Sequence, residues 1–515
     1  MALIDSVSLP WWAWVALTVA VYTITNKISY HIRLRKSGAS EPPFIRDYIF
    51  GFWFSLEILR RSKTGDMPEF FGEMFDKVYG DTVLFRSTGS LRYTTRDPEN
   101  IKAVLSTQFS DFSLGLRHKQ FRVLLGDGIF TLDGDGWKHS RAMLRPQFAK
   151  EQVSPGAMLE SHVQHVLRRI KIQNGSKFDI QPLFFKLTID SGTEFLFGES
   201  CSSLQDDIVK LSDLEGPEGV ELFPEAFNTS QYYLLLRSGL HNSYFILTTR
   251  EFRKCNRIVH NFADYYVEKA LAATPEELAK KNENGYVFLY ELVKQTRNPV
   301  VLRDQCLNIL IAARDTTAGL LSFVFFELAR NPEIFRKLRT EIVEAFGEGE
   351  TADLSKMTFE SLKKLEYLKW VLHETLRLYP SVPMNSRLAT KDTTLPRGGG
   401  PNGQEPVFVP KGEVVVYSVF VTHRNPAIYG KDANTFRPER WGEARLKKVG
   451  WGFLPFNGGP RICLGQQLAL TQASYVTARL LQNFSEIDSF DNPGDPRKNV
   501  HLTMSLLDGA NIRLY

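Results

Sequence analysis

The sequence predicts a mainly α-helical fold with minor β sheets, an α+β protein, preceded by a single membrane-anchoring helix. Three observations lead to this prediction. An uncharged, largely apolar stretch runs from Ser6 to Asn26, and a proline-free apolar stretch runs from Val300 to Arg330. Runs of β-branched residues, which favour strands, gather later in the chain, around residues 407–421.

Composition and charge exclude several classes of protein. Of the 515 residues, 43% are hydrophobic and 23% are charged, which is ordinary for a globular protein. A disordered chain, a disulfide-stapled miniprotein and a multi-span membrane protein are therefore excluded. The net charge of +5 is too small and too dispersed to indicate a nucleic-acid partner. Length alone suggests three or four domains of about 150 residues each.

The N-terminal apolar stretch is long enough to cross a membrane, because a helix rises about 1.5 Å per residue and the hydrocarbon core is about 30 Å thick. Basic residues follow the stretch and only Asp5 precedes it, which places the following residues in the cytosol. A cleaved signal peptide is the alternative, but its positive charge would precede the apolar run. We therefore expect residues 1–43 to form a transmembrane anchor and a proline-containing linker.

Helical spacing of apolar residues dominates from about Met67 to Arg387. The clearest helix is Val300–Arg330, bounded by Pro299 and Pro332, and it is apolar enough to run through the core. The other expected elements are helices over 360–379 and 464–481, and strands over 407–409 and 413–421 on either side of a turn.

The four cysteines, at positions 201, 255, 306 and 463, form no CxxC pair, so neither a zinc site nor a disulfide framework is indicated. Cys463 differs from the others because glycines surround it and a predicted helix follows it directly. The positive end of a helix favours a thiolate, so Cys463 could be a nucleophile or a metal ligand. A small buried hydrophobe and the cysteine of a Cys/His hydrolase are the alternatives, although no histidine lies in this segment.

The segment from Phe456 to Gly465 matches the pattern Phe-x-x-Gly-x-Arg-x-Cys-x-Gly, which resembles the haem-binding signature of the cytochrome P450 family. The resemblance implies a cytochrome P450 fold with haem b, iron protoporphyrin IX, as cofactor. It further implies that the Cys463 thiolate is the ligand of the haem iron. Arg461 would pair with a haem propionate, and Phe456 would pack beside the sulfur.

Glu374 and Arg377 lie three residues apart and therefore share one helix face. Taken alone, a solvated surface ion pair explains this spacing. The later segment Phe436–Trp441 resembles the family's Pro-Glu-Arg-aromatic segment. This resemblance implies that Arg440 joins the pair in a buried structural network, which holds the loop leading to Cys463.

Polar residues interrupt the long apolar stretch at Arg314, Asp315 and Thr316. A threonine that bonds back to the preceding turn would explain them without any function. In the family that the chain resembles, the matching acid–threonine pair lies over the haem. The resemblance implies that Asp315 relays protons and that Thr316 holds a water there. Ala313 stands where the family usually has glycine, and its methyl group would narrow the groove beside the pair.

Trp137 and Arg141 match the family's Trp-x-x-x-Arg helix, in which both side chains share one face and can donate to one propionate. Arg387 resembles a further propionate-contacting position. A surface helix or a solvated arginine would explain each of these singly. However, five motifs stand in the family's order from Trp137 to Gly465 and would have to meet at one haem. Residues 44–515 are therefore expected to form one haem-thiolate monooxygenase catalytic domain.

Several segments, among them Gly126–Trp137 and Asp392–Gly400, resemble the fungal branch of the family that hydroxylates n-alkanes and fatty acids. This resemblance implies terminal (omega) oxidation of a long aliphatic chain. Electrons would come from NADPH-cytochrome P450 reductase in the same endoplasmic reticulum membrane, with the catalytic domain in the cytosol. The candidate substrate pocket is made of apolar residues: Ile311, Ala312, Pro383, Met384, Leu502 and Met504.

Other functions remain open from the sequence. They are oxidation of another lipophilic substrate such as a sterol, a secondary metabolite or a xenobiotic, isomerisation or dehydration without dioxygen, and a haem carrier or sensor. The last two have less need of an acid–threonine pair. Arg117, His118 and Arg122 could bind a fatty-acid carboxylate, although a solvated basic face is the more ordinary explanation. A basic patch for the reductase is expected at Lys138, Arg145, Lys447 and Lys448.

Overall fold

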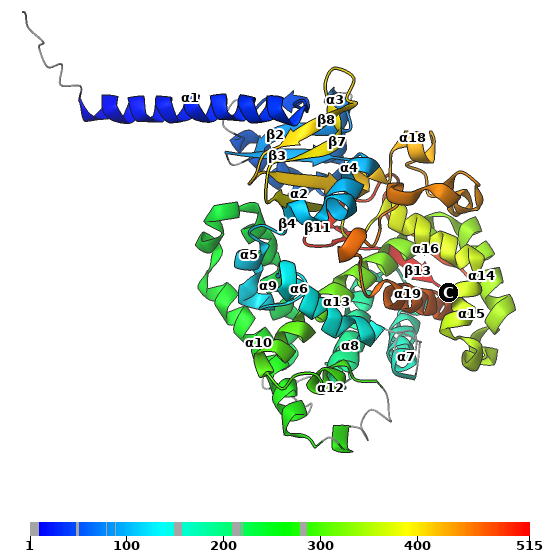
Figure 1. The fold of residues 1–515 in the computed structure, drawn as a ribbon. Helices are drawn as coiled ribbons and strands as arrows, with labels where there is room; N and C mark the ends of the chain where they lie inside the picture. Colours follow the sequence, from blue (N-terminus) through cyan, green and yellow to red (C-terminus); the bar gives the residue numbers. More distant parts are fainter. Residues whose placement is uncertain are drawn as a thin grey trace, which may run out of the picture.

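The computed structural model describes residues 10–47, 51–78, 80–87, 89–148, 157–208, 217, 220–274, 276–278 and 286–515. Helices make up most of the molecule, and four small sheets accompany them in the described residues. Figure 1 shows the strands of the largest sheets gathered in the upper part, with most helices below and to the right of them. The predicted fold class, mainly α with minor β sheets, is confirmed.

The described helices are α1 (Trp11–Ser37), α2 (Phe52–Thr64), α3 (Met67–Val78), α4 (Pro98–Lys102), α5 (Arg117–Leu125), α6 (Gly134–Leu144), α7 (Ala157–Ile172), α8 (Gln181–Phe197), α9 (Phe223–Gly239), α10 (Arg250–Ala272), α12 (Phe288–Val293), α13 (Pro299–Arg330), α14 (Pro332–Phe346), α15 (Phe359–Lys364), α16 (Glu366–Leu378), α17 (Val419–Thr422), α18 (Pro426–Tyr429) and α19 (Gln466–Asn483). The strands are β1 (Phe44–Ile45), β2 (Thr82–Ser87), β3 (Ser90–Thr95), β4 (Phe112–Ser113), β5 (Phe178–Asp179), β6 (Met384–Ala389), β7 (Thr393–Gly399), β8 (Glu405–Val409), β9 (Val414–Ser418), β10 (Ile487–Ser489), β11 (Lys498–Val500), β12 (Met504–Leu506) and β13 (Asn511–Leu514).

Helix α1 projects away from the rest of the molecule (Figure 1), and none of its 27 residues is buried. Trp11, Trp12 and Trp14 are all more than half exposed. An isolated helix with this much exposed apolar surface is not stabilised by packing in water, so its side chains need an apolar environment. By mean hydropathy, α13 is the one described helix that could cross a membrane, but 78% of its apolar window is buried and it is a core helix.

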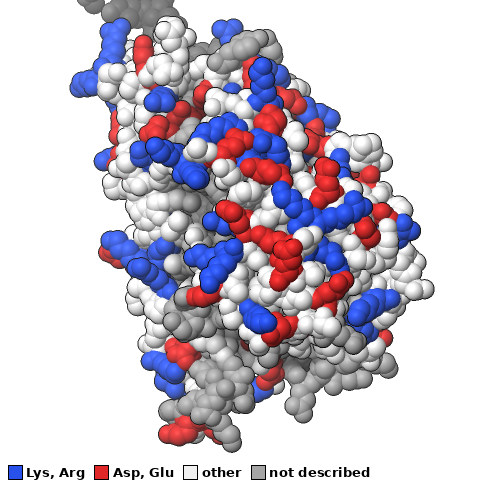
Figure 2. Space-filling model, turned by 90° about the vertical axis from the view of Figure 1, so that its right-hand side faces the viewer, with Lys and Arg blue, Asp and Glu red and all other residues white. Residues whose placement is uncertain are grey.

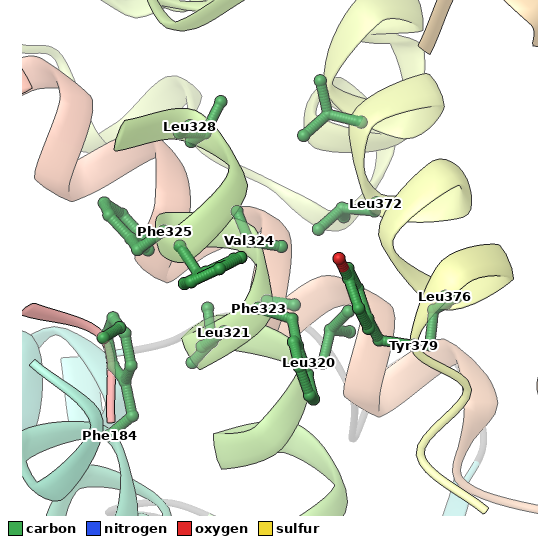
Figure 3. Packing of buried hydrophobic residues seen from close by; sticks show 14 of the residues in the cluster. Phe184, Leu320, Leu321, Phe323, Val324, Phe325, Leu328, Leu372, Leu376 and Tyr379 are labelled. Carbon is green, nitrogen blue, oxygen red and sulfur yellow. The ribbon is translucent and has the colours of Figure 1, made fainter. Parts of the chain in front are cut away.

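Helix α13 runs through the centre of the molecule, as predicted. Its first turn is capped by Asn298, whose side chain accepts hydrogen bonds from the N–H groups of Val300 and Val301. Its C-terminal half packs against α16 in the main hydrophobic core (Figure 3). There the rings of Phe323 and Tyr379 are stacked, with centroids 4.2 Å apart.

Two details of the predicted secondary structure were wrong. The single helix expected over 360–379 is two helices, α15 and α16, because the backbone of Leu365 is extended (ψ 102°). The region expected to be mostly helical also contains β2 and β3, which form an antiparallel pair. These strands alternate poorly between apolar and polar residues because both lie between other strands and each has four consecutive buried residues, so both faces are covered there.

The largest sheet has the strand order β1-β2-β3-β9-β6-β4. The strands on either side of the turn at residues 410–412 both exist, but they belong to different sheets: β8 pairs with β7, and β9 pairs with β3 and β6. The pairing of β6 with β9 places Arg387 opposite Val415. The sheet thereby positions Met384 and Arg387, the two residues of β6 that the sequence assigns to the site.

Candidate active site

Cys463 lies in a tight loop directly before α19. Its N–H donates to the carbonyl oxygen of Phe456 (3.0 Å). Two glycines of this loop are needed because neighbouring protein leaves no room for a side chain: a Cβ on Gly459, a fixed position of the signature, would lie 1.9 Å from the carbonyl oxygen of Leu105, and one on Gly458 would lie 2.6 Å from the Trp451 ring. Gly459 also has a positive φ of 66°, which only glycine adopts readily.

The thiol of Cys463 combines two properties that are rarely found together. The side chain is exposed, yet desolvation by the surrounding protein raises the pKa of the thiol. The backbone N–H of Gly465 and the charge of Arg141 act in the opposite direction and favour the thiolate. Cys463 is therefore surrounded by protein while its sulfur still faces an accessible space.

The middle of α13 faces an accessible space as well. Between Asp304 and Ala329 the helix is buried, except for Ala312, Ala313, Asp315 and Thr316, which are partly exposed. The hydroxyl of Thr316 donates to the carbonyl oxygen of Ala312 (2.6 Å). This is the hydrogen bond back to the preceding turn that would explain a threonine here without any catalytic role. That bond uses the hydroxyl hydrogen and leaves the oxygen free to accept one.

Asp315 is held by its neighbour Arg314, to which the sequence analysis assigned no role. Nη1 of Arg314 donates to Oδ1 of Asp315 (3.1 Å) and to Oδ1 of Asn228 on α9. The buried guanidinium lies over the rings of Phe185 and Phe227. The carboxylate of Asp315 is therefore oriented by a side chain that also ties α13 to α9.

Three arginines with largely buried side chains, Arg117, Arg387 and Arg461, form what we call the arginine cluster. Arg117 and Arg387 both donate to Oδ1 of Asn385, at 2.8 and 3.3 Å. Desolvation, together with the like charges of the cluster, lowers the pKa of Arg117 and of Arg461 to about 10. The carboxylate of Asp133, 2.8 Å from Arg461, offsets part of the charge. Nε of Arg387 is buried without a hydrogen-bond partner.

The sequence identified Arg387 and Arg461 but treated Arg117 as part of a solvated face, and this was wrong. No motif surrounds Arg117; only the fold brings α5 next to β6. His118 and Arg122 do lie towards solvent, next to Asp127.

Trp137 and Arg141 connect α6 to the cysteine loop. The guanidinium of Arg461 lies 4.4 Å from the centre of the Trp137 ring. Nη1 of Arg141 donates to the carbonyl oxygen of Ile462, next to Cys463 (3.0 Å). Both residues of the Trp-x-x-x-Arg pair therefore lie beside the arginine cluster and the sulfur.

Glu374, Arg377 and Arg440 form a second buried group, which we call the acid-centred network. All three side chains are completely buried. Glu374 accepts from Arg377 at 2.8 and 2.9 Å and from Arg440 at 2.7 Å. The remaining donors of the two arginines reach backbone carbonyls of residues 423–435, and Arg440 also pairs with the carboxylate of Asp432 (3.3 Å). The alternative of a solvated surface pair is wrong for this site.

The six candidate pocket residues fall into two groups. Ile311, Pro383 and Met504 are buried against neighbouring protein. Ala312, Met384 and Leu502 are partly exposed. Ser381 connects their segments, since its hydroxyl donates to the carbonyl oxygen of Thr316 (3.3 Å) and its carbonyl accepts from the N–H of Met504 (2.9 Å).

These side chains fit haem. The buried Nε of Arg387 and the excess positive charge of the arginine cluster call for an anion, and haem carries two propionates. Cys463 offers the exposed sulfur that haem iron takes as a thiolate ligand. Arg117, Arg387, Arg461, Trp137 and Arg141 are the residues that would hold the propionates.

Comparison with known proteins agrees with this geometry. The family profile for cytochrome P450 matches residues 48–507. The chain is 56% identical over 508 residues to cytochrome P450 52A12 of Debaryomyces hansenii, with 97% of each chain covered. It is 56% identical to cytochrome P450 52A5 of Candida maltosa, covering all of this chain and 98% of the relative. It is 53% identical to cytochrome P450 52A6 of Candida tropicalis, covering 98% of this chain and 97% of the relative. A haem-thiolate signature, buried arginines that lack an anion and relatives matched along their whole length lead to one conclusion: the chain belongs to the cytochrome P450 family and is a haem-dependent P450 monooxygenase.

Proposed function

We propose that this P450 hydroxylates long-chain aliphatic substrates, n-alkanes or fatty acids, at the terminal carbon. The observation that carries the proposal is the partly exposed turn of α13. It presents two alanine methyl groups next to the Asp315–Thr316 pair, and Met384 and Leu502 are partly exposed nearby. An aliphatic chain has no polar handle except at its end. Apolar burial, at about 0.8 kcal/mol per CH₂, is what holds it.

Haem bound at Cys463 supplies the activation of dioxygen. The residues of this chain position the reactants and move protons. Thr316 can accept a hydrogen bond from a water, because its own hydrogen is used by Ala312. Asp315 can pass a proton to that water, and Arg314 holds its carboxylate through a hydrogen bond to Oδ1. Terminal attack further requires a narrow channel that keeps internal C–H bonds away from the iron.

The test is product analysis with dodecane and a long-chain fatty acid, using the full-length protein with reductase and NADPH. Terminal alcohols are the expected products, and exclusive internal hydroxylation would overturn the proposal. Conversion of a sterol with no aliphatic product would favour the alternative of another lipophilic substrate. Cys463→Ala should abolish the red-shifted band of the reduced, carbon monoxide-bound protein.

The proposed domain organisation is a membrane anchor over residues 1–43 and a catalytic domain over 44–515. The endoplasmic reticulum membrane is the proposed location, with the catalytic domain in the cytosol, because Lys27, Arg33 and Arg35 follow the apolar part of α1. The end of α1 contacts the catalytic domain: Arg33 pairs with Asp392 (2.8 Å), and the rings of Tyr30 and Phe408 lie 5.8 Å apart.

Electrons are proposed to come from NADPH-cytochrome P450 reductase. Arg145, Lys447 and Lys448 are exposed, and Arg145 acts electrostatically on Arg141 beside Cys463. The face of the molecule seen in Figure 2 carries basic and acidic residues side by side, and no extended area of it has a single sign of charge. Charge reversal at Lys447 and Lys448 should slow reductase-supported turnover. Unchanged turnover would remove this pair from the proposed docking patch.

A further inference from the structure

Each turnover of a monooxygenase consumes protons as well as electrons. Inserting one oxygen atom of O₂ into a C–H bond and reducing the other atom to water takes two protons and two electrons. In the proposed mechanism Asp315 passes protons to the water at Thr316, so its carboxylate has to be recharged from solvent. The side chain of Asp315 is only 13% exposed, and that of its partner Arg314 only 5%. A guanidinium does not release its proton in a protein, so Arg314 cannot recharge Asp315.

The turn between β11 and β12 packs on the face of α13 that carries Asp315. Asp315 and Gly319 lie four residues apart and therefore share one face of the helix. A Cβ on Gly319 would lie 2.6 Å from the carbonyl oxygen of Met504, the first residue of β12. Met504 pairs with Val500, so residues 501–503 form the turn of this hairpin. The missing side chain at Gly319 lets the hairpin approach α13 closely, one helical turn from Asp315.

His501 is the titratable residue of this turn, and it is partly exposed. Its backbone N–H donates to the carbonyl oxygen of Thr503 (2.9 Å), which holds the turn in shape. Neither ring nitrogen makes a hydrogen bond within the described residues, so both can bind water. Desolvation lowers the pKa of the imidazole, and the negative charge of Asp315 acts in the opposite direction. The ring and the carboxylate therefore lie near each other.

Helix α9 borders this arrangement on its exposed side. Asn228 and Tyr232 lie four residues apart and share one face of α9. Asn228 accepts a hydrogen bond from Arg314, and the ring of Tyr232 lies 5.6 Å from the ring of His501. Both residues of α9 are exposed, Tyr232 to 46%. His501 therefore lies between a helix face that water reaches and the carboxylate of Asp315.

We propose that His501 is the residue through which protons enter this site: it takes a proton from solvent and passes it, by way of water, to Asp315. The neutral ring accepts a proton from bulk water at one nitrogen and becomes an imidazolium. The imidazolium then releases a proton to a bridging water, which protonates the oxygen of Asp315 that Arg314 leaves free. The ring returns to its neutral form, the carboxylate becomes a carboxyl group, and no electron moves.

Histidine suits this position because its ring gains and loses a proton between pH 5 and 8. It acts through Asp315 and does not touch the reacting atoms, so it supports the acid–threonine pair without belonging to it. The inference rests on the proposed proton transfer by Asp315. It does not depend on which substrate is oxidised, because every C–H bond that is hydroxylated with O₂ requires the same number of protons.

The first test requires no turnover. NMR titration of the histidine rings in the full-length, reduced, carbon monoxide-bound holoenzyme gives the pKa of His501, whose signal is assigned by its loss in His501→Gln. Asp315→Asn should lower this pKa, because it removes the negative charge that favours the imidazolium. His165, partly exposed on α7, is the matched control, and its pKa should stay the same. An unchanged pKa of His501 would overturn the inference.

The second test compares two ways of driving hydroxylation, with dodecane or with whichever lipophilic substrate the unmodified enzyme oxidises. His501→Phe keeps an aromatic ring beside Tyr232 but carries no proton. It should slow the reaction supported by NADPH and reductase by about tenfold or more, as expected for loss of a proton-transfer group. The reaction supported by hydrogen peroxide should continue at its normal rate, because peroxide brings its protons with the oxygen. His165→Phe is the control and should change neither rate.

An equal fall in both reactions would indicate damage to the site and overturn the inference, and so would an unchanged rate with NADPH. Asp315→Asn in the same assays separates the two proposals. If Asp315→Asn retains full turnover with NADPH, the proposed role of Asp315 fails and the entry through His501 fails with it. If Asp315→Asn slows turnover while His501→Phe does not, only the inference about His501 fails.

Discussion

The acid-centred network and the arginine cluster are both built from buried arginines, yet they are organised in opposite ways. In the network, Glu374 lies between Arg377 and Arg440, and the donors of both arginines reach acceptors within the protein. In the arginine cluster, Asp133 is the single carboxylate in direct contact among the described residues, and Nε of Arg387 has no partner.

The difference separates structural charges from binding charges. A buried charge that is fully paired within the chain leaves nothing for a ligand, so the acid-centred network can act only by holding the polypeptide. A buried charge whose partners are missing is complete only when an anion binds. By this criterion we propose that the arginine cluster is a binding site, which would take the propionates of haem.

The largest effect is expected from breaking the acid-centred network. Glu374→Ala would leave the buried guanidinium of Arg377 without a carboxylate and that of Arg440 with Asp432 alone, and should lower the free energy of unfolding by about 3–5 kcal/mol. Urea unfolding of the purified protein measures this. Glu366→Ala, at the exposed start of the same helix, is the control. Should Glu374→Ala yield no folded protein, Glu374→Gln should show a smaller loss. A loss below about 1 kcal/mol in either variant would contradict the structural role.

The network also makes stability depend on pH through His423. Nε2 of His423 accepts from the N–H of Leu454 (2.7 Å), and Nδ1 lies 3.2 Å from the carbonyl oxygen of Arg377. Desolvation, reinforced by the charge of Arg377, lowers the pKa of His423 from 6.5 to about 3. The folded state therefore requires the neutral ring. This contribution is complete above about pH 6.5 and is lost at about 1.4 kcal/mol per pH unit as the pH falls towards 3.

At pH 4.5 His423 is protonated in the unfolded chain but still neutral in the folded protein, so the free energy of unfolding should be lower by about 3 kcal/mol than at pH 7. His423→Gln keeps an acceptor for Leu454 and has no proton to gain, so its stability should fall less steeply with acid. Unfolding curves of both proteins between pH 7 and 4.5 measure the difference. Parallel curves would show that His423 does not carry this part of the acid sensitivity.

In the arginine cluster, removal of one charge should affect the cofactor rather than the polypeptide. Arg387→Met relieves repulsion among like charges, so the protein without haem should not lose stability. Haem should dissociate about tenfold faster, because a charge-assisted hydrogen bond to a propionate is lost. Transfer of haem to an excess of a haem-binding acceptor protein measures this rate. Arg397→Met, half-exposed on β7, is the control. If Arg387→Met released haem faster but also lowered the free energy of unfolding of the haem-free protein to a similar extent, Arg387 would belong with the structural charges.

The smallest effect is expected for the ion pair of Arg33 and Asp392, which is exposed and so belongs neither to the paired buried charges nor to the buried charges that lack a partner. Arg33 and Asp392 are 40% and 36% exposed and lie 2.8 Å apart. Arg33→Ala should change the free energy of unfolding by less than about 1 kcal/mol. Thermal unfolding at low and high salt measures it, and salt should remove even this difference. A loss of about 2 kcal/mol or more would mean that the docked end of α1 is a structural element of the domain.

Much of the site was accessible from the sequence because the family signature is local. Phe456, Arg461, Cys463 and Gly465 lie within ten residues, and their order indicates a haem ligand without knowledge of the fold. The helix Val300–Arg330 was predictable for the same reason, since prolines bound it and apolar residues predominate along it. By contrast, the break at Leu365 and the strands β2 and β3 depend on neighbours distant in the sequence.

The sequence by itself therefore determined the family and the N-terminal apolar helix, and it singled out the cysteine proposed as haem ligand and the acid–threonine pair, because each is carried by residues close together along the chain. Only the tertiary structure decided which charges are paired. Arg117 joins Arg387 through Asn385, Arg314 joins Asp315 to α9, and Arg92 meets His241 across well over a hundred residues of chain. Whether a buried arginine is structural or a binding group depends on the partners that folding brings within about 3 Å of it, and sequence spacing contains no information about those distances.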